Sequence, residues 1–560
     1  MAAQARLESA LNRAEWQPAL FGPLNRARLA SWSLEGASAS FRVRVHRNHA
    51  IEPVISAVTP FAGWNGLAFT WDIGPYDDSL TFAATSAADV ELIWFDRDRL
   101  RNLSDEDFVA WFASRLHVLR ARTTRPIVVG VWPLAATARQ ALDRAKPTAT
   151  DIVDLDVLAT ALGANWLDLR AASISGTRLS NQACLRIARE LACCWLPAAL
   201  IAPIKCVALD LDGTLYGGVL GEDGVERIAL TGGHRELQEY LIELKRTGML
   251  LALVTRNERA DVDALFARHG GFPLALADFA VVEASWDDKG ALLERVAHQL
   301  RIGLDSIVFV DDNPGELASV AAASNVITVH ARPDGRETVE ALRHVAGVHR
   351  RRILREDALR ADDLDAAERR DVLLRVSATP EEYLRSLRVH LEYHVGSHLQ
   401  VPRMAELSRK TNQFNLGLSR MTEAEIEAKL RACPASVVAV GLRDRLADSG
   451  IVAVLVGDLD GDVLHVSEVA VSCRALGRRL EDTMLTRALL LMAQGRAVRT
   501  VTFDVKVGPR NAPSREWLAA YVGRAEPPGA GSVSIALATI AAKRCLTGYA
   551  ESVEWPKVAA

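Results

Sequence analysis

Apolar and polar residues follow two periods along the chain, and these periods predict alternating strands and helices. Short uninterrupted apolar runs are typical of strands that are buried on both faces of a parallel sheet. Strand-like segments lie at residues 40–45, 91–95, 126–132, 207–211, 250–254 and 307–310. Helical spacing lies between them at residues 105–123, 180–191, 235–246 and 259–269. The pattern therefore predicts an α/β fold with parallel sheets.

The same pattern divides the chain into three domains and a linker, because 560 residues are more than one hydrophobic core usually holds. We expect an N-terminal α/β domain at 1–198, a second α/β domain at 203–345 and a charged helical linker at 346–378. The remainder, 379–560, carries strands at 451–456 and 463–471 and then a helix, which predicts an α+β domain. Glycines within 217–224 predict a β-turn flap.

Charge and composition limit the kinds of molecule that the protein is expected to bind and the compartment in which it is expected to work. The chain has 66 basic and 70 acidic residues and a net charge of −4, so nothing points to nucleic acid or an anionic membrane as a partner. Residues 1–16 are amphipathic and charged, unlike a signal sequence, and prolines interrupt the most apolar stretch, 191–204. Seven cysteines without paired metal-ligand spacing favour a reducing compartment. We therefore expect a cytoplasmic protein.

Two carboxylates follow the apolar run 207–211 and carry the first chemical signal. Asp210 and Asp212 precede Gly213 and Thr214, at the strand end where open α/β sheets bind ligands. Paired carboxylates repel each other unless a cation or a proton lies between them. Asp210 is a candidate nucleophile for a phosphoryl group, Asp212 a candidate general acid and base, and Thr214 a phosphate-binding hydroxyl. The alternative is a strand that simply ends in an acidic turn.

Further polar residues follow the next strands in an order that strengthens this signal. Thr255 ends the strand at 250–254, Lys289 precedes a helix, and Asp311 and Asp312 end the strand at 307–310. A lysine in this position is able to hold Asp210 and a transferring phosphoryl group together. Each residue alone has an ordinary structural explanation. Together they predict a phosphoryl-transfer site.

The carboxylates also predict a metal. Asp311 and Asp312 suit a hard cation such as Mg²⁺, with Asp210 and the backbone carbonyl of Asp212 completing the ligand shell. The intervals 214–254 and 255–289 are too short for an inserted cap domain. An uncapped site suits a phosphate carried on a macromolecule, or needs another domain as a lid.

The segment 205–224, with the motifs at 286–289 and 308–316, resembles the HAD phosphotransferase superfamily and, within it, the FkbH-like proteins of polyketide assembly. The resemblance implies a capless, Rossmann-like domain. It also implies an enzyme that takes D-1,3-bisphosphoglycerate, removes phosphate and loads the glyceryl unit onto the phosphopantetheine arm of an acyl carrier protein. By position it implies Asp210 as nucleophile, Asp212 as acid and base, and Thr255 with Lys289 as phosphate ligands. Gly213 departs from the family's usual Asn, and Thr255-Arg256 departs from its usual Ser-Lys.

The C-terminal region extends this resemblance. Residues 410–416, Lys-Thr-Asn-Gln-Phe-Asn-Leu, resemble a signature of the same family. The loop after the strand 463–471 resembles the acyl-CoA loop of GNAT acetyltransferases, in which N–H groups at a helix N-terminus hold a pyrophosphate. Arg474, Gly477 and Arg478 are accordingly expected to bind a phosphopantetheine arm. Arg479 replaces a small residue of that loop.

Cys473 is the cysteine with the clearest chemical potential. A thiol at a helix N-terminus between arginines is expected to be held more as the thiolate, which suits an acyl tether. The alternative is a small residue that packs at a strand end. Cys206 lies within a buried strand and is expected in the core. The others are treated as structural: Cys184, Cys193, Cys194, Cys433 and Cys545.

The N-terminal domain carries less chemistry. Its α/β pattern is SGNH-like, but no Gly-Asp-Ser follows its first strand, so no serine nucleophile is assigned. Asp168 and Arg170 are either ligands or a loop ion pair, and we expect a scaffold or docking surface. Two alternatives stand for the whole protein: a Mg²⁺-dependent phosphatase of another metabolite with the GNAT-like domain as lid, and a catalytically silent docking scaffold.

Overall fold

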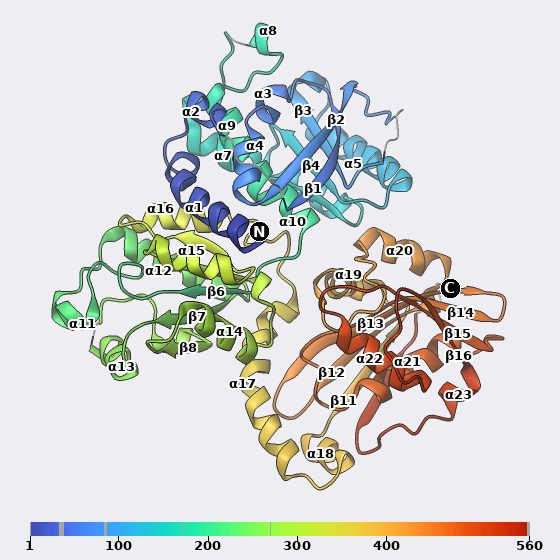
Figure 1. Cartoon of the computed structure of the whole chain (residues 1–560). Coiled ribbons are helices and arrows are strands. Elements are labelled where there is room, and N and C mark those ends of the chain that lie inside the picture. The colour runs from blue at the N-terminus through green and yellow to red at the C-terminus, as the bar shows by residue number, and fades with distance from the viewer. Residues whose placement is uncertain (1, 33–37, 83–86, 171, 269, 557–560) are drawn as a thin grey trace. The chain divides into compact units, whose positions relative to one another are not determined.

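The computed structural model describes residues 2–32, 38–82, 87–170, 172–268 and 270–556. They form two compact units, Met1–Ile353 and Leu354–Ala560. Unit 1 carries two parallel sheets and unit 2 carries one mixed sheet (Figure 1), so the fold is multidomain α/β as predicted. The expected boundary near residue 198 falls inside unit 1. Of the helices within the described residues, none combines the length and apolar character that crossing a membrane requires.

The first sheet of unit 1 has the order β2-β1-β3-β4-β5, and all its neighbouring strands are parallel. Its strands are β1 (Ala39–Arg47), β2 (Leu67–Tyr76), β3 (Val90–Asp96), β4 (Ile127–Trp132) and β5 (Thr150–Ile152). Its helices are α1 (Ala2–Phe21), α2 (Arg26–Ala30), α3 (Glu52–Ile55), α4 (Val58–Trp64), α5 (Asp105–Arg122), α6 (Ala136–Ala145), α7 (Leu155–Leu162), α8 (Ala172–Ser175), α9 (Asn181–Glu190) and α10 (Leu196–Leu200). Helices α5 and α6 cover one face, and α4, α7 and α9 cover the other.

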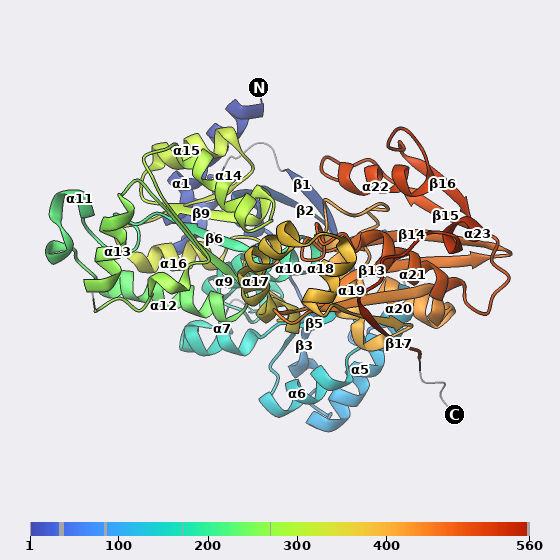
Figure 2. The ribbon, with the colours of Figure 1, turned by 90° about the horizontal axis from the view of Figure 1, so that it is seen from below.

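The second sheet has the order β10-β9-β6-β7-β8 and is again entirely parallel. Its strands are β6 (Cys206–Leu209), β7 (Leu250–Thr255), β8 (Val281–Ala284), β9 (Ile307–Asp311) and β10 (Ile327–His330). Its helices are α11 (Leu220–Asp223), α12 (Gly232–Arg246), α13 (Arg259–Arg268), α14 (Lys289–Gln299), α15 (Pro314–Ala323) and α16 (Gly335–Arg343). Helices α14 and α15 cover one face, while α12, α13 and α16 cover the other (Figure 2).

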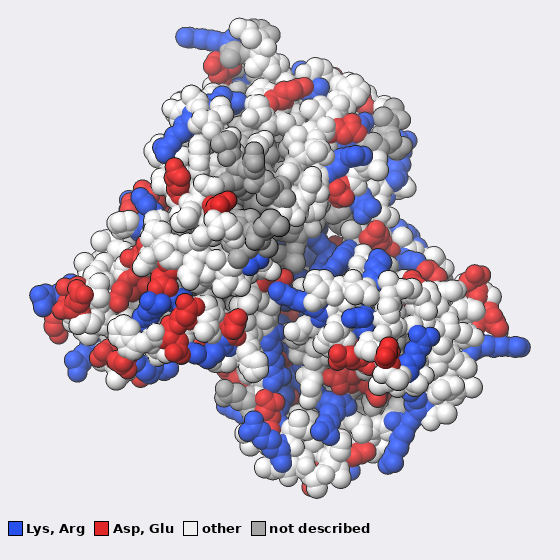
Figure 3. Space-filling view, viewed as in Figure 1, with Lys and Arg blue, Asp and Glu red and all other residues white. Residues whose placement is uncertain are grey.

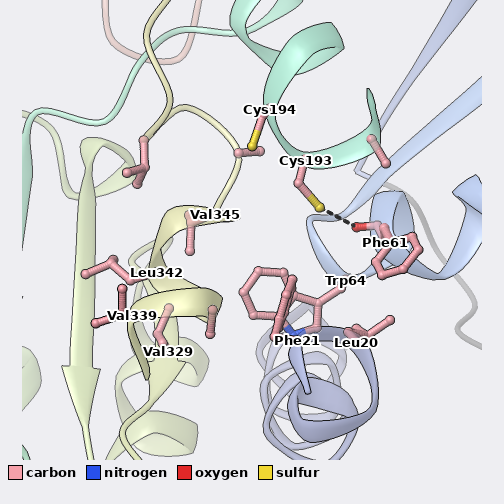
Figure 4. Close-up of a cluster of buried hydrophobic side chains, with 14 of the residues drawn as sticks. Leu20, Phe21, Phe61, Trp64, Cys193, Cys194, Val329, Val339, Leu342 and Val345 are labelled. Atoms are coloured by element: carbon pink, nitrogen blue, oxygen red, sulfur yellow. Dashed lines mark hydrogen bonds between the residues drawn. The ribbon is translucent and has the colours of Figure 1, made fainter. Parts of the chain in front are cut away.

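The two sheets of unit 1 share a hydrophobic cluster. Leu20, Phe21, Phe61 and Trp64 face residues of the second sheet and of α16, among them Leu342 (Figure 4). Polar contacts reinforce the junction: Nε2 of Gln17 donates to the carbonyl oxygen of His330 at 2.6 Å, at the edge strand β10. Burial of this shared apolar surface makes one unit of what the pattern predicted as two domains.

Unit 2 is built on the sheet β16-β15-β14-β13-β12-β11-β17, in which the β14–β15 and β11–β17 pairs are parallel. Its strands are β11 (His390–Val395), β12 (Val437–Arg443), β13 (Asp448–Asp460), β14 (Val463–Val471), β15 (Thr500–Val505), β16 (Gly531–Ala536) and β17 (Ala550–Glu554). Its helices are α17 (Arg355–Val376), α18 (Pro380–Leu387), α19 (Val401–Lys410), α20 (Glu423–Ala432), α21 (Glu481–Ala493), α22 (Ala512–Val522) and α23 (Leu537–Ala541). The predicted helical linker is thus largely α17, which belongs to unit 2.

Most predicted strands and helices of unit 1 agree with the structure to within three residues, and one element is corrected. The segment 217–224, predicted as a β-turn flap, contains the short helix α11 instead. Gly218 and Gly224 have positive φ angles, of 113° and 69°, and these allow the chain to enter and leave that turn. The predicted end of the helix 259–269, His269, lies outside the described residues, and α13 is described to Arg268.

Candidate active site

The carboxyl edge of the second sheet gathers the polar residues that follow its strands. Leu209 of β6 pairs with Leu253 of β7 and with Val310 of β9, so the three strands end side by side. Asp210 therefore lies beside Asp311, and its backbone N–H donates to the carbonyl oxygen of Val310 at 2.9 Å. Because the chain goes from β6 to β7 on one side and places β9 on the other, this edge is the topological switch point, where α/β sheets bind ligands.

Lys289 lies buried between the two carboxylates. Helix α14 begins at Lys289, after Asp288, whose Oδ1 accepts a hydrogen bond from the Gly290 N–H at 2.8 Å. Nζ of Lys289 lies 2.5 Å from Oδ1 of Asp210 and 3.2 Å from Oδ2 of Asp311. It also donates to the carbonyl oxygen of Val254 at 2.9 Å, and the residue is only 3% exposed. The cap of α14 thus positions an ammonium group inside an acidic site.

The electrostatics of the site call for an additional positive charge. Burial, with a smaller contribution from the charge of Asp311, raises the pKa of Asp210 to about 7 against the opposing effect of the Lys289 ammonium. Burial and the charge of Asp311 also raise the pKa of Asp312. Three carboxylates surround one ammonium, an arrangement that favours either a proton or a bound cation.

The three carboxylates form a group with the composition of a divalent-metal site. One oxygen from each of Asp210, Asp311 and Asp312 lies within 4.8 Å of the other two. Oδ2 of Asp311 is buried and accepts no hydrogen bond within the described part of the chain, although the Lys289 ammonium lies near it. Hard carboxylate oxygens are the ligands that Mg²⁺ prefers, so these residues fit that ion. The side chain of Asp212 is outside this group.

Asp212 is held instead by three hydrogen-bond donors. Its Oδ1 accepts from the Tyr216 hydroxyl and, at 2.8 Å, from the backbone N–H of Leu220, the first residue of α11. Its Oδ2 accepts from Nδ2 of Asn257 at 2.8 Å. Sequence analysis assigned no role to Tyr216 or Asn257. The available signal was their spacing, because each follows a site threonine, Thr214 or Thr255, by two residues.

The two threonines differ in their hydrogen bonding. Oγ1 of Thr255 accepts from Nδ2 of Asn257 at 2.9 Å. Thr214 is also buried, but its hydroxyl has no hydrogen-bond partner among the described residues. A buried hydroxyl normally finds a partner, so Thr214 is suited to a ligand oxygen.

Gly213 permits the close approach of Asp312. Its φ angle is 63°, and a Cβ at this position would overlap the Asp312 carboxylate. A side chain here would displace one of the three clustered carboxylates. The departure from Asn at this position therefore has a steric reason in this chain.

In the loop predicted to bind a phosphopantetheine arm, two arginines contact other residues of unit 2. The guanidinium of Arg478 is buried, with Nη2 3.0 Å from Oδ1 of Asp363 and Nη1 3.2 Å from Oδ2 of Asp444. Arg474 donates from Nη2 to the carbonyl oxygen of Glu356 at 2.7 Å. Both arginines thus bind helix α17 or its surroundings. Their role as phosphate ligands stays a prediction.

Two more observations describe the same loop, and the first corrects the expected position of Cys473. Helix α21 begins only at Glu481, so Cys473 and Gly477 lie in the turns that precede it and Cys473 is not at a helix N-terminus. The Gly477 N–H donates to Oε1 of Glu481 at 3.0 Å, and Asp482 follows in the first turn. Carboxylates at a helix N-terminus take the place that an anion would occupy. Cys473 is half-buried.

The segment 410–416 closes the space between β14 and β15. These strands pair only from Val463 to Val466 of β14, and beyond that point Asn415 forms an antiparallel bridge with Ala470 of β14. The Val471 N–H donates to the carbonyl oxygen of Phe414 at 2.9 Å, and the Lys506 N–H donates to that of Leu416 at 2.9 Å. The segment therefore contributes one isolated bridge residue, Asn415, beside β14.

The remaining candidates have structural surroundings. Oδ1 of Asp168 accepts from the backbone N–H of Arg170 at 3.0 Å, which closes a local turn. All seven cysteines are free, and Cys206 is buried in β6 as expected.

Acidic and basic side chains are interspersed over the face of unit 1 around α11, α12 and α13 (Figure 3).

Comparisons with known proteins give distant likenesses only. No family model and no curated protein matches the chain. The N-terminal part of protein BF1531 from Bacteroides fragilis, containing a phosphatase domain complexed with Mg, is 19% identical over 62% of this chain and 99% of that chain, with a TM-score of 0.46.

Two acetyl-transferring enzymes are more distant still. A variant of the spermidine N-acetyltransferase of Vibrio cholerae is 12% identical over 27% of this chain and 95% of that chain, with a TM-score of 0.20. The N-acetylglutamate synthase of Neisseria gonorrhoeae, complexed with coenzyme A and L-arginine, is 12% identical over 77% of this chain and 87% of that chain, with a TM-score of 0.16. The chemistry of the site therefore rests on its own side chains.

Proposed function

We propose that unit 1 is a Mg²⁺-dependent phosphatase of the HAD type that works through a phosphorylated Asp210. The observation that carries this proposal is the position of Lys289, whose ammonium lies 2.5 Å from Asp210 and 3.2 Å from Asp311 at the switch point of the sheet. A buried ammonium beside a nucleophile is placed to neutralise charge that develops on a transferring phosphoryl group. The proposed setting is the cytoplasm.

The residues have complementary tasks in two steps. In the first step, a carboxylate oxygen of Asp210 attacks phosphorus, the bond from phosphorus to the substrate oxygen breaks, and that oxygen takes a proton from Asp212. In the second step, water attacks the phosphorus of phospho-Asp210 and gives a proton to Asp212. Inorganic phosphate leaves, and both carboxyl groups return to their initial states.

The surrounding residues support these tasks. Asp210, Asp311 and Asp312 would hold Mg²⁺, which supplies charge neutralisation when bound. Tyr216 and Asn257 orient Asp212 through its two carboxylate oxygens. The unpartnered hydroxyl of Thr214 would bind a phosphate oxygen.

For the substrate we propose a phosphorylated three-carbon unit, D-1,3-bisphosphoglycerate, whose glyceryl group goes to an acyl carrier protein. The Cys473 thiol would attack the acyl carbon of the mixed anhydride and release inorganic phosphate, which takes the thiol proton. Asp210 would remove the second phosphate, and the thiol of the phosphopantetheine arm would then take the acyl group and free Cys473. The family resemblance of the motifs around Asp210, Lys289 and Asp311 supports this assignment.

The uncovered sheet edge also suits a carrier-bound substrate. The interval between Thr214 and α12, which the structure describes in full, holds only α11 and the 3-10 turn Val225–Arg227. No inserted domain therefore shields this edge within that interval, and a large substrate has access to it.

The test is phosphate release by the Asp210→Asn protein, with Asp263→Asn as control. Asp263 is an exposed residue of α13 that pairs with Arg259, so its replacement should leave activity unchanged. We expect the Asp210→Asn protein to release no phosphate from an aryl phosphate with Mg²⁺, while the wild type and the control do. Equal activity of all three proteins would remove Asp210 as nucleophile.

A second experiment tests the substrate. The full chain is incubated with D-1,3-bisphosphoglycerate and a holo carrier protein, and the carrier is weighed intact. A glyceryl mass increment that requires Cys473 supports the transfer. Phosphate release without any loaded carrier would favour a phosphatase that acts on another metabolite.

A further inference from the structure

One face of helix α1 carries three polar side chains that bind backbone groups of β10 and α15. Arg6, Arg13 and Gln17 follow one another at intervals of seven and four residues, a spacing that places them on the same helical face. Helix α1 lies beside α15 and α16 (Figure 1). Arg6 donates to the carbonyl oxygens of Ala321 and Ala322, at 3.1 and 2.7 Å. The first helix of the chain therefore packs directly on the part of unit 1 that holds the phosphatase site.

The same face of α1 covers the outer edge of strand β10. This strand is the last of its sheet, and Thr328 and His330, two residues apart, turn their backbone groups to its outer edge. Nη2 of Arg13 donates to the carbonyl oxygen of Thr328 at 3.3 Å. The amide of Gln17 pairs with both backbone groups of His330: Nε2 donates to the carbonyl oxygen at 2.6 Å, and Oε1 accepts from the N–H at 3.2 Å. Gln17 is 2% exposed, so water does not compete for these hydrogen bonds.

The ring of His330 extends this contact to the loop that carries the metal site. His330 pairs with Asp311 across β10 and β9, so it lies at the same sheet edge as the carboxylates. Nε2 of His330 lies 3.0 Å from the backbone carbonyl oxygen of Asp312. A carbonyl oxygen only accepts, so Nε2 carries a proton and donates it. Gln17 thus holds the backbone of His330, and the ring of His330 holds the backbone of Asp312.

Asp312 is the carboxylate of the metal group that depends most on such support. Asp311 is 1% exposed and ends strand β9, whereas Asp312 is exposed and lies in the loop after that strand. Gly213 limits where the side chain of Asp312 lies, and His330 fixes its backbone. A metal ligand on a loop binds more weakly when its backbone is free to move, because binding must then order it.

We propose that Gln17, His330 and Asp312 form a relay through which helix α1 sets the Mg²⁺ affinity of the phosphatase site. The relay rests on the proposed function, because that function assigns the ion to Asp210, Asp311 and Asp312. Gln17 and His330 are positioning residues, since neither would touch the ion or the substrate. The first helix is then a working part of the phosphatase, in place of the scaffold or docking surface that the sequence predicted.

The test measures divalent-ion binding by the full chain, with Mn²⁺ as a probe of the Mg²⁺ site. Electron paramagnetic resonance detects the free Mn²⁺, so the measurement does not depend on turnover. The Mn²⁺ that the native protein binds and the Asp312→Asn protein does not bind is assigned to this site.

Variants of His330 test the second half of the relay. His330→Leu removes the donor to Asp312 and should weaken Mn²⁺ binding by about tenfold, the usual effect of losing a group behind a metal ligand. His330→Gln restores an N–H donor near the position of Nε2 and should recover most of this loss. His298→Leu is the matched control, because His298 is an exposed residue in the last turn of α14, and it should bind Mn²⁺ as the native protein does.

Variants of Gln17 test the first half of the relay. Gln17→Leu removes the side-chain partner of the His330 backbone and should weaken Mn²⁺ binding by about threefold. Gln4→Leu is the matched control, because Gln4 is an exposed residue of the same helix that donates to Glu8 at 2.9 Å. Gln17→Asn shortens the side chain by one methylene and takes the place of Gln17→Leu if that variant does not fold. Since Gln17 acts through His330, the double variant should bind no more weakly than His330→Leu alone.

The outcomes separate the relay from the proposed function. If the native protein binds Mn²⁺ at this site and the His330 and Gln17 variants bind it equally well, the relay is rejected while the phosphatase stands. If the two losses add in the double variant, Gln17 does not act through His330, and the relay is again rejected. If the native protein binds no more Mn²⁺ than the Asp312→Asn protein, the metal site itself is rejected and the relay with it.

Discussion

The two parallel sheets of unit 1 differ in strand order, each has a switch point at its carboxyl edge, and the two edges carry different chemistry. At the β6–β9 edge, Asp210 and Asp311 surround the ammonium of Lys289. At the β1–β3 edge, Trp94 and His49 line an aromatic cavity. Topology therefore decides where each crevice lies, and the side chains that line the crevice decide what it binds.

The difference also explains why only the acidic edge was visible in the sequence. The acidic edge is made by residues that directly follow apolar runs, so a short motif reports it. The aromatic edge combines His49 and Trp94 with Trp166 and Arg178, which approach it from distant loops. Four ways to break or sharpen this comparison follow, ordered by expected effect.

Removing the ammonium should have the largest effect. Lys289→Met leaves Asp210 and Asp311 buried without a counter-charge, so we expect phosphatase turnover to fall by about 10²–10³-fold. The free energy of unfolding without Mg²⁺ should fall by about 3–5 kcal/mol at neutral pH. Steady-state kinetics and urea unfolding measure the two effects.

Lys245→Met is the control for this change, because Lys245 pairs with Asp278 at 2.7 Å near the surface. Its loss should cost less than about 1 kcal/mol and leave turnover unchanged. Similar losses in both variants would contradict a special role for Lys289.

Acid should lower the free energy of unfolding of unit 1, because the buried ring of His49 is neutral in the folded protein and takes up a proton more readily when the protein unfolds. The pKa of His49 falls from its ordinary value of 6.5 to about 3 on folding, mainly through burial. The stability contributed by the neutral ring is complete above pH 6.5 and is lost as the pH falls toward 3. Between pH 7 and pH 5, unit 1 of the native protein should lose about 2 kcal/mol more than that of His49→Gln. Urea unfolding at the two pH values measures this difference, and parallel losses would contradict a neutral, buried ring.

A methyl group at Gly213 should weaken the metal site. Gly213→Ala places Cβ against the Asp312 carboxylate, so Mg²⁺ affinity should fall by about tenfold, the loss that a misplaced ligand carboxylate causes. Gly224→Ala changes a glycine with a similar φ angle, 69°, and has open space around the Cβ. Mg²⁺ titration of phosphate release compares them, and equal losses would attribute the effect to backbone strain alone.

The smallest effect should come from removing the Thr214 hydroxyl. Thr214→Val keeps the shape of the side chain, so the free energy of unfolding should change by less than about 1 kcal/mol, while kcat/KM falls by about fivefold. Thr231→Val should behave in the reverse way, because Thr231 caps α12 through the His234 N–H at 3.2 Å. A loss of stability without any loss of activity in Thr214→Val would give this hydroxyl a structural role.

The sequence predicted the strands of unit 1 better than its polar contacts. Apolar runs located β6, β7 and β9, and the residues after them placed Asp210, Thr255 and Asp311 on one edge. The hydrogen bond from the Leu220 N–H to Asp212 was not predictable, since it depends on the turn that becomes α11 rather than a flap. For the loop after β14, the sequence suggested a ligand-binding role, whereas the structure shows contacts within unit 2. Arg474 and Arg478 looked available for phosphate, because their partners on and around α17 lie far away in the sequence.

By itself, the sequence determined the order of strands and helices and the acidic motif at one sheet edge, because apolar periodicity and strand-end residues are local properties. Only the tertiary structure decided which charges are neutralised and which polar groups stay without partners. It buried Arg478 against Asp363 and Asp444 and joined the two sheets through Phe21 and Leu342. Among the residues that the structure describes, it left the Trp94 and Trp166 N–H groups without a hydrogen-bond partner. Hydrogen bonding and burial depend on contacts between residues that are far apart in the sequence, and local sequence patterns do not predict those contacts.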